Sequence, residues 1–202
     1  MTSIKICGLT RMEDIEAVNR VRPDYVGFVF WSKSRRAIDM ETALMLRRTL
    51  DPAIPAVGVF VDQPMEDILA LLRARAIDIA QLHGHETPED IKALKGRGCK
   101  SVWKAFKVRT EEDLTLAEES PADLVLLDNG YGTGERFDWS LLIRPPQRPW
   151  LLAGGLTPEN IPEAIRTFAP WGIDISSGVE TNGQKDPDKI MVAVAAARRG
   201  HL

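Results

Sequence analysis

Residues 150–180, WLLAGGLTPENIPEAIRTFAPWGIDISSGVE, decide the fold of this chain. An apolar run at residues 150–153 predicts a buried strand, which two glycines end. Thr157 can then cap a helix with Pro158 in its first turn, and apolar residues recur at helical spacing as far as Phe168. A short second strand is expected at residues 172–175. The segment is therefore predicted to form one strand–helix–strand unit.

Both of these strands end in a turn of small residues, Gly154-Gly155 after the first and Ser176-Ser177-Gly178 after the second. Either turn alone is more often an ordinary tight turn than a binding site. Two such turns at successive strand ends, however, leave backbone N–H groups that can bind an anion. In an eight-stranded barrel the loops after strands 7 and 8 frequently hold phosphate. The pair of turns predicts a phosphate site.

The rest of the chain repeats the same alternation. Apolar runs predict strands at residues 3–7, 24–30, 56–61, 77–82, 99–106, 123–128, 150–153 and 172–175. Helical patterns follow them at residues 12–21, 40–50, after Pro64, after Thr87-Pro88, at 110–119, near 138–143, after Gly155, and at 187–199. Eight such units predict a single α/β domain over residues 1–202, a (β/α)8 TIM barrel. A doubly wound open sheet is the alternative.

Composition limits the possible functions. The chain has 202 residues, of which 44% are hydrophobic and 27% charged, as in an ordinary globular protein. A net charge of −3 gives no basic surface for nucleic acid or membrane. Cys7 and Cys99 suggest neither a disulfide framework nor a metal site, and the N-terminal residues lack a signal-peptide pattern. We expect a soluble, reduced, cytoplasmic protein.

The strand ends carry the candidate chemistry, because these positions point into the mouth of such a barrel. Cys7 ends the first strand, and Lys5 projects from the same face two residues earlier. A neighbouring ammonium group lowers the pKa of a thiol, so Cys7 could serve as a base or nucleophile. The alternative is that Cys7 is a small buried apolar residue.

Three more candidates lie at other strand ends. Asp128 closes the sixth strand, where it either caps the next turn or acts as an acid, and a glycine-rich segment at residues 129–134 follows it. A basic loop at residues 32–36 (SKSRR) follows the second strand, and arginine suits bidentate binding of a carboxylate. His83 either bonds a backbone carbonyl in a structural role or takes part in the function of the site. An acid and a base at one barrel mouth indicate proton transfer, as in an isomerase.

Seven motifs, in order along the chain, carry a resemblance to a known family. They are KICGLT (5–10), GFVF (27–30), VGVFV (57–61), QLHG (81–84), GTGERFDW (132–139), LAGGLTPEN (152–160) and SSGVE (176–180). Together they resemble phosphoribosylanthranilate isomerase, an enzyme of tryptophan biosynthesis with a barrel of the ribulose-phosphate-binding type. AGGL and SSGVE occur in other phosphate-binding barrels, whereas KICGLT with QLHG and FDW is far more specific.

The resemblance implies an Amadori rearrangement of N-(5-phosphoribosyl)anthranilate. Asp128 matches the general acid that opens the ribose ring, and Cys7 matches the general base that removes the C2′ proton. Arg36 matches the arginine that binds the anthranilate carboxylate, although the sequence Ser34-Arg35-Arg36-Ala37 departs from the usual loop and leaves Arg35 as an alternative. Gly155 and the Ser176–Gly178 turn match the phosphate-binding turns. No cofactor or metal is implied, and relatives occur as monomers and homodimers.

Three other functions remain open at this point. An aldolase on the same barrel would need a Schiff-base lysine, for which Lys104 is the candidate. A non-catalytic phosphate-binding protein would have kept the barrel and lost the chemistry. An isomerase that also accepts the aminoaldose of histidine biosynthesis is less favoured, because that chemistry typically pairs two aspartates and position 7 is a cysteine.

Overall fold

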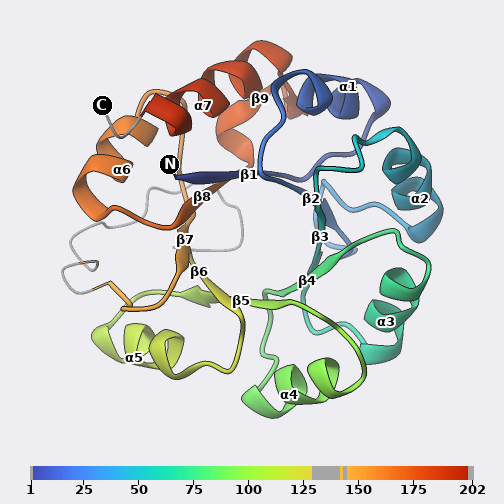
Figure 1. Cartoon of the computed structure of the whole chain (residues 1–202), viewed down its shortest axis with the longest axis vertical. Coiled ribbons are helices and arrows are strands. Elements are labelled where there is room, and N and C mark those ends of the chain that lie inside the picture. Colours follow the sequence, from blue (N-terminus) through green and yellow to red (C-terminus); the bar gives the residue numbers. More distant parts are fainter. Residues whose placement is uncertain (1, 129–141, 143–144, 200–202) are drawn as a thin grey trace.

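Eight parallel strands close into a barrel in which each strand pairs with the next along the chain, and β8 pairs with β1 (Figure 1). The computed structural model describes residues 2–128, 142 and 145–199. The strands are β1 (Ser3–Cys7), β2 (Tyr25–Val29), β3 (Ala56–Phe60), β4 (Ile79–Leu82), β5 (Val102–Lys107), β6 (Leu124–Asp128), β7 (Trp150–Leu152) and β8 (Gly172–Ile175). This confirms the predicted (β/α)8 barrel and rules out the open sheet.

Seven helices in the described residues surround the barrel (Figure 1). They are α1 (Met12–Val21), α2 (Met40–Thr49), α3 (Met65–Arg73), α4 (Pro88–Gly96), α5 (Glu111–Glu119), α6 (Ile161–Phe168) and α7 (Pro187–Arg199). Because strands in such a barrel are covered on both faces, they are almost continuously apolar in sequence. The helical turn expected near residues 138–143 lies largely outside the described residues.

Alternation along each strand decides which side chains point inward. In β6, Val125 and Leu127 pack in the layer between strands and helices, whereas Leu124 and Leu126 belong to a separate cluster inside the barrel. Because successive side chains of a strand point to opposite faces, Asp128 also points inward, at the carboxyl end of β6. The same alternation brings Lys5 and Cys7 inward in β1, with Ile4 and Ile6 in the outer layer.

The start of α6 differs from its prediction. The helix begins at Ile161 with Asn160 at its N-cap position, and Thr157–Asn160 form a turn instead of the expected cap and first helical turn. The side chain of Asn160 accepts a hydrogen bond from the Thr157 N–H at 2.8 Å and donates one to the Gly155 carbonyl at 3.0 Å. Asn160 therefore braces the loop that follows β7.

The sequence prediction also missed a small hairpin after β8. A 3-10 turn, Ser177–Val179, leads into β9 (Glu180–Thr181), which pairs antiparallel with β10 (Gln184–Lys185). Asn182 and Gly183 join the two strands, and both have positive φ angles. Asn-Gly is a strong sequence signal for such a turn, because both residues tolerate a positive φ angle. Within the described residues, no helix has both the length and the apolar character that crossing a bilayer requires.

Candidate active site

A cavity opens at the carboxyl ends of the strands and collects most of the residues that the sequence singled out. Eight predicted site residues line it: Cys7, Arg36, His83, Asp128, Gly154, Gly155, Ser176 and Ser177. These residues come from strand ends and loops around the whole barrel, so the closed fold brings them together. Among the described lining residues, Lys5, Gly178 and Arg35 are absent.

Lys5 lies fully buried beside Cys7, where it forms an ion pair with Asp174. Its ammonium donates to Asp174 Oδ2 at 2.9 Å, and the two residues are register partners in β1 and β8. Burial lowers the pKa of Lys5, but the Asp174 carboxylate and the Cys7 thiol outweigh burial and leave this pKa raised. Lys5 is therefore a charged group within the barrel that is already paired with a carboxylate.

The expectation that Lys5 lowers the pKa of the Cys7 thiol below its ordinary value is wrong. Burial raises the pKa of the Cys7 thiol, and the nearby Asp174 carboxylate raises it further. Lys5 and Lys185 lower it, but only in part. The main reason is that burial of the thiol disfavours its charged form, and the Asp174 carboxylate adds to this effect while it pairs with the cation on which the prediction relied.

Asp128 and His83 form the opposite side of the cavity. Asp128 is 5% exposed, and its Oδ2 lies 3.5 Å from His83 Nε2. The backbone N–H of His83 donates to the Phe60 carbonyl at 2.7 Å, which fixes the start of the loop after β4. His83 thus combines a structural backbone contact with a side chain beside the candidate acid. The glycine-rich segment at residues 129–134 lies outside the described residues.

The two small-residue turns lie side by side at the rim. Gly154 and Gly155 have φ angles of 84° and 66°, which favour glycine. No group in the described part of the chain accepts a hydrogen bond from either of their N–H groups. Gly178 is needed for packing and not for its φ angle, because a Cβ at this position would collide with the Leu156 carbonyl oxygen. Gly178 therefore allows the loop after β8 to pack against the loop after β7.

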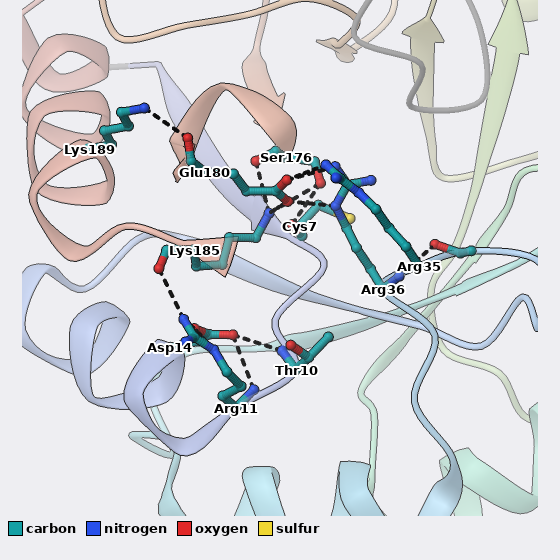
Figure 2. Close-up of polar contacts among 11 residues, drawn as sticks. Cys7, Thr10, Arg11, Asp14, Arg35, Arg36, Ser176, Glu180, Lys185 and Lys189 are labelled. Atoms are coloured by element: carbon teal, nitrogen blue, oxygen red, sulfur yellow. Dashed lines mark hydrogen bonds and ion pairs between the residues drawn. The ribbon is translucent and has the colours of Figure 1, made fainter. Parts of the chain in front are cut away.

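Arg36 reaches the cavity from the loop after β2, and Glu180 holds it there (Figure 2). Its Nε donates to Glu180 Oε1 at 2.6 Å and its Nη2 to Glu180 Oε2 at 3.1 Å. Arg35 also contacts Glu180 Oε2, at 2.5 Å, but its side chain is 58% exposed and lies off the cavity lining. Of the two candidates, only Arg36 lines the cavity.

The structure adds two polar residues that the sequence prediction missed. Gln81 Oε1 and Asp174 Oδ1 are buried, and neither finds a hydrogen-bond partner among the described residues. Both residues line the cavity. The sequence contains the information needed to predict both residues. Ala80 of β4 and Ile173 of β8 pack in the outer layer, so the next side chain of each strand points into the barrel.

Lys104 does not support the aldolase alternative. Its ammonium donates to the Gly84 carbonyl at 2.7 Å and to Glu86 Oε2 at 2.8 Å, and it is only 6% exposed. Lys104 is absent from the described lining of the cavity. Among the described residues, no three or more His, Cys, Asp and Glu side chains come together in a way that could hold a metal ion.

A closed (β/α)8 barrel with a thiol, a carboxyl group and an arginine around one cavity defines a class, the barrel enzymes whose site lies at the carboxyl ends of the strands. Comparison with known proteins gives the particular family. The family model for N-(5'-phosphoribosyl)anthranilate (PRA) isomerase matches residues 4–196, and the chain belongs to this family. Its members are enzymes of tryptophan biosynthesis.

Similar proteins cover almost the whole chain. The N-(5'-phosphoribosyl)anthranilate isomerase of Lacticaseibacillus casei is 46% identical over 198 residues, which is 98% of this chain and 96% of that protein. The crystal structure of the phosphoribosyl anthranilate isomerase from Thermus thermophilus is 36% identical, covers 98% of both chains and has a TM-score of 0.87. An isomerase in complex with reduced 1-(o-carboxyphenylamino)-1-deoxyribulose 5-phosphate is 37% identical, with a TM-score of 0.86 and coverage of 98% and 99%.

Proposed function

We propose that this cavity catalyses the Amadori rearrangement of N-(5-phosphoribosyl)anthranilate to 1-(o-carboxyphenylamino)-1-deoxyribulose 5-phosphate, with Asp128 as general acid and Cys7 as general base. The observation that carries these roles is the placement of the two groups. They end β6 and β1, and between these strands lie β7 and β8, whose loops are the candidate phosphate turns. A substrate held by its phosphate at those loops would thus have an acid on one side and a thiol on the other.

The reaction needs two proton transfers that these residues can supply. Asp128 gives a proton to the ribose ring oxygen O4′, and the C1′–O4′ bond breaks to leave a protonated Schiff base. Cys7, as the thiolate, removes the proton from C2′ to give an enolamine. The enolamine then gains a proton at C1′ and loses one from the C2′ hydroxyl, which becomes the ketone. O4′ and C1′ each gain a proton while C2′ and its hydroxyl each lose one, so the sequence is an isomerisation.

The raised pKa of Cys7 is compatible with its role as a base once the substrate is bound. A protonated Schiff base beside the thiol adds a positive charge, which favours the thiolate. That charge would act together with Lys5 and Lys185, which already lower the pKa of Cys7 in part. The cavity therefore supports a base that is activated by the reaction intermediate itself.

The other lining residues are suited to hold the substrate. The N–H groups of Gly154 and Gly155, which have no acceptor among the described residues, would bind the phosphate together with Ser176 and Ser177. Arg36 would bind the anthranilate carboxylate. Gln81 Oε1 and Asp174 Oδ1, which have no hydrogen-bond partner in the described part of the chain, line the cavity and are suited to accept from ribose hydroxyl groups. We further propose that the enzyme acts in the cytoplasm, as a monomer or as a homodimer.

Turnover by single-residue variants tests these assignments. The assay follows the loss of anthranilate fluorescence when freshly generated phosphoribosylanthranilate is added, with the ketose product confirmed by mass. We expect Cys7→Ser and Asp128→Asn each to lower kcat by roughly 10²- to 10⁴-fold, the usual contribution of a general acid or base, with binding of the reduced product largely kept. Cys99→Ser is the matched control, since that cysteine is also buried but lies outside the described cavity lining.

Each other outcome has a definite meaning. Near-normal rates in Cys7→Ser or Asp128→Asn would remove that residue from the mechanism. Binding without turnover by the unmodified chain would favour the non-catalytic phosphate-binding protein. Borohydride trapping of a sugar phosphate on Lys104 would favour the aldolase.

A further inference from the structure

Glu180, at the start of the β9–β10 hairpin, gathers three cations around one nearly buried carboxylate (Figure 2). Its side chain is 5% exposed. Oε1 accepts from Arg36 Nε at 2.6 Å and from Lys185 Nζ at 2.8 Å, and Oε2 accepts from Arg36 Nη2 and Arg35 Nη2. Burial raises the pKa of Glu180, but hydrogen bonds from Arg36 and Lys185 outweigh burial and leave it lowered. Glu180 is therefore held as a carboxylate.

Within the described residues, the Arg36–Glu180 pair leaves one edge of the Arg36 guanidinium without a hydrogen-bond partner. Glu180 occupies the side edge, formed by Nε and one N–H of Nη2. The end edge, formed by Nη1 and the other N–H of Nη2, is a second fork that can bind a carboxylate with two hydrogen bonds. Nη1 of Arg36 makes no hydrogen bond within the described part of the chain. Glu180 thus fixes the arginine without using the edge that a ligand would need.

Lys185 links this arrangement to the candidate phosphate turn. Its ammonium donates to the Ser176 carbonyl at 2.8 Å and lies 3.3 Å from Ser176 Oγ. Ser176 Oγ in turn donates to the Cys7 carbonyl at 3.0 Å. One buried ion pair, Glu180–Lys185, therefore connects the loop that carries Arg36 with the turn after β8 and the end of β1.

The hairpin that carries both residues is held from two helices. Arg11, beside α1, donates to Gln184 Oε1 at 2.7 Å and to the Lys185 carbonyl at 3.0 Å, and Asp14 orients Arg11 through two further hydrogen bonds. Lys189 of α7 donates to the Glu180 carbonyl at 2.8 Å. These contacts fix the position of the β9–β10 hairpin relative to α1 and α7 (Figure 2).

We propose that Glu180 and Lys185 are positioning residues that set the orientation of Arg36 and its separation from the phosphate turn. The hairpin thereby selects ligands that carry a carboxylate and a phosphate at a matching distance. This inference rests on the proposed role of Arg36 as the carboxylate receptor. The three cations outnumber the one carboxylate, so the cluster still attracts a second anion after Glu180 is counted.

The test compares two ligands that differ in one group. The first is reduced 1-(o-carboxyphenylamino)-1-deoxyribulose 5-phosphate, and the second is its phenylamino counterpart without the carboxyl group. The Kd of the second ligand divided by the Kd of the first measures recognition of the carboxylate, and this ratio is large when the carboxylate is recognised. In Glu180→Gln we expect this ratio to fall by roughly tenfold, the value of one misdirected charge-assisted hydrogen bond, and KM to rise more than kcat falls. Glu163→Gln on α6 makes the same chemical change at an exposed position and should leave the ratio unchanged.

Two further variants keep the result interpretable. Glu180→Asp retains the charge, but its side chain is one methylene shorter, so the carboxylate is drawn back from Arg36 and the ratio should fall even if Glu180→Gln folds poorly. Arg36→Ala should abolish discrimination between the ligands. An unchanged ratio in Arg36→Ala would overturn the proposed role of Arg36. A ratio that collapses in Arg36→Ala but is kept in both Glu180 variants would overturn the positioning role alone.

Discussion

At Cys7, burial and the charges of the nearby lysines act on the pKa of the thiol in opposite directions, and burial dominates. The pKa of its thiol is raised above the ordinary value of 9.0 despite the nearby lysines. Because the thiolate reacts and its fraction increases with pH, a raised pKa moves reactivity to higher pH. We expect the rate of iodoacetamide modification of Cys7, measured in a Cys99→Ser background, to rise with pH and reach its midpoint above 9.0.

Lys5 provides an internal check on that prediction. Replacement of Lys5 by methionine removes the main group that lowers the pKa of Cys7, so the midpoint should move still higher. Modification of the unchanged protein with a midpoint near neutral pH would show that the thiol is already activated before substrate binds. Protection from iodoacetamide by the reduced product would place the reactive thiol in the cavity.

For single residues, the sequence predicted which side chains point into the barrel better than it predicted which side chains they contact. The alternation of inward and outward side chains along each strand predicted that Cys7 and Asp128 point into the barrel at the ends of their strands. This prediction depends only on residues that are neighbours in the sequence. The partner of Lys5 could not be predicted in the same way, since Asp174 lies 169 residues away and meets Lys5 only through the register of barrel closure. The role of Glu180 cannot be predicted for the same reason, since Arg36 lies 144 residues before it in the sequence.

The two loops that carry the candidate phosphate turns depend on each other through Gly178. A methyl group at this position would collide with the Leu156 carbonyl oxygen and crowd Thr157, so Gly178→Ala should push the two loops apart. We expect weaker binding of the reduced product by calorimetry and a loss of roughly 1–3 kcal/mol in the free energy of unfolding, as for other overpacking substitutions.

Gly96, the last residue of α4, offers a matched control for this loop prediction. A Cβ at Gly96 meets nothing within 4 Å, so Gly96→Ala should be neutral or slightly stabilising and should leave binding unchanged. Equal effects of the two substitutions would contradict the packing role of Gly178.

Sequence signals also decided how well each element was predicted. Strands were found to within a few residues because their burial on both faces gives long apolar runs. The start of α6 was misplaced because Thr157-Pro158 and Asn160 are both plausible helix starts, and Asn160 prevails by also bonding the Gly155 carbonyl. The hairpin was missed because its strands have two residues each, too short for any periodicity.

The whole barrel is closed by β1 and β8, and the Lys5–Asp174 pair crosses that seam. Breaking a buried ion pair by removing one partner leaves an unpaired charge, which typically costs about 3–5 kcal/mol. We expect Lys5→Met to lower the free energy of unfolding by about that amount in denaturant titrations. An exposed pair should behave differently: Lys92→Met removes the contact with Glu89, whose side chain is 78% exposed, and should cost roughly 1 kcal/mol or less.

The double variant Lys5→Met/Asp174→Leu distinguishes two contributions to the free energy of unfolding: the loss caused by an unpaired buried charge and the stabilisation supplied by the ion pair itself. If the loss in Lys5→Met comes from stranding the Asp174 carboxylate, replacing both residues by apolar ones should restore much of the stability. The barrel would then close without the ion pair, and the pair would be retained for its place beside Cys7 and the cavity rather than for folding. A double variant as unstable as Lys5→Met would show instead that closure itself depends on this contact, since no stranded charge would remain to explain the loss.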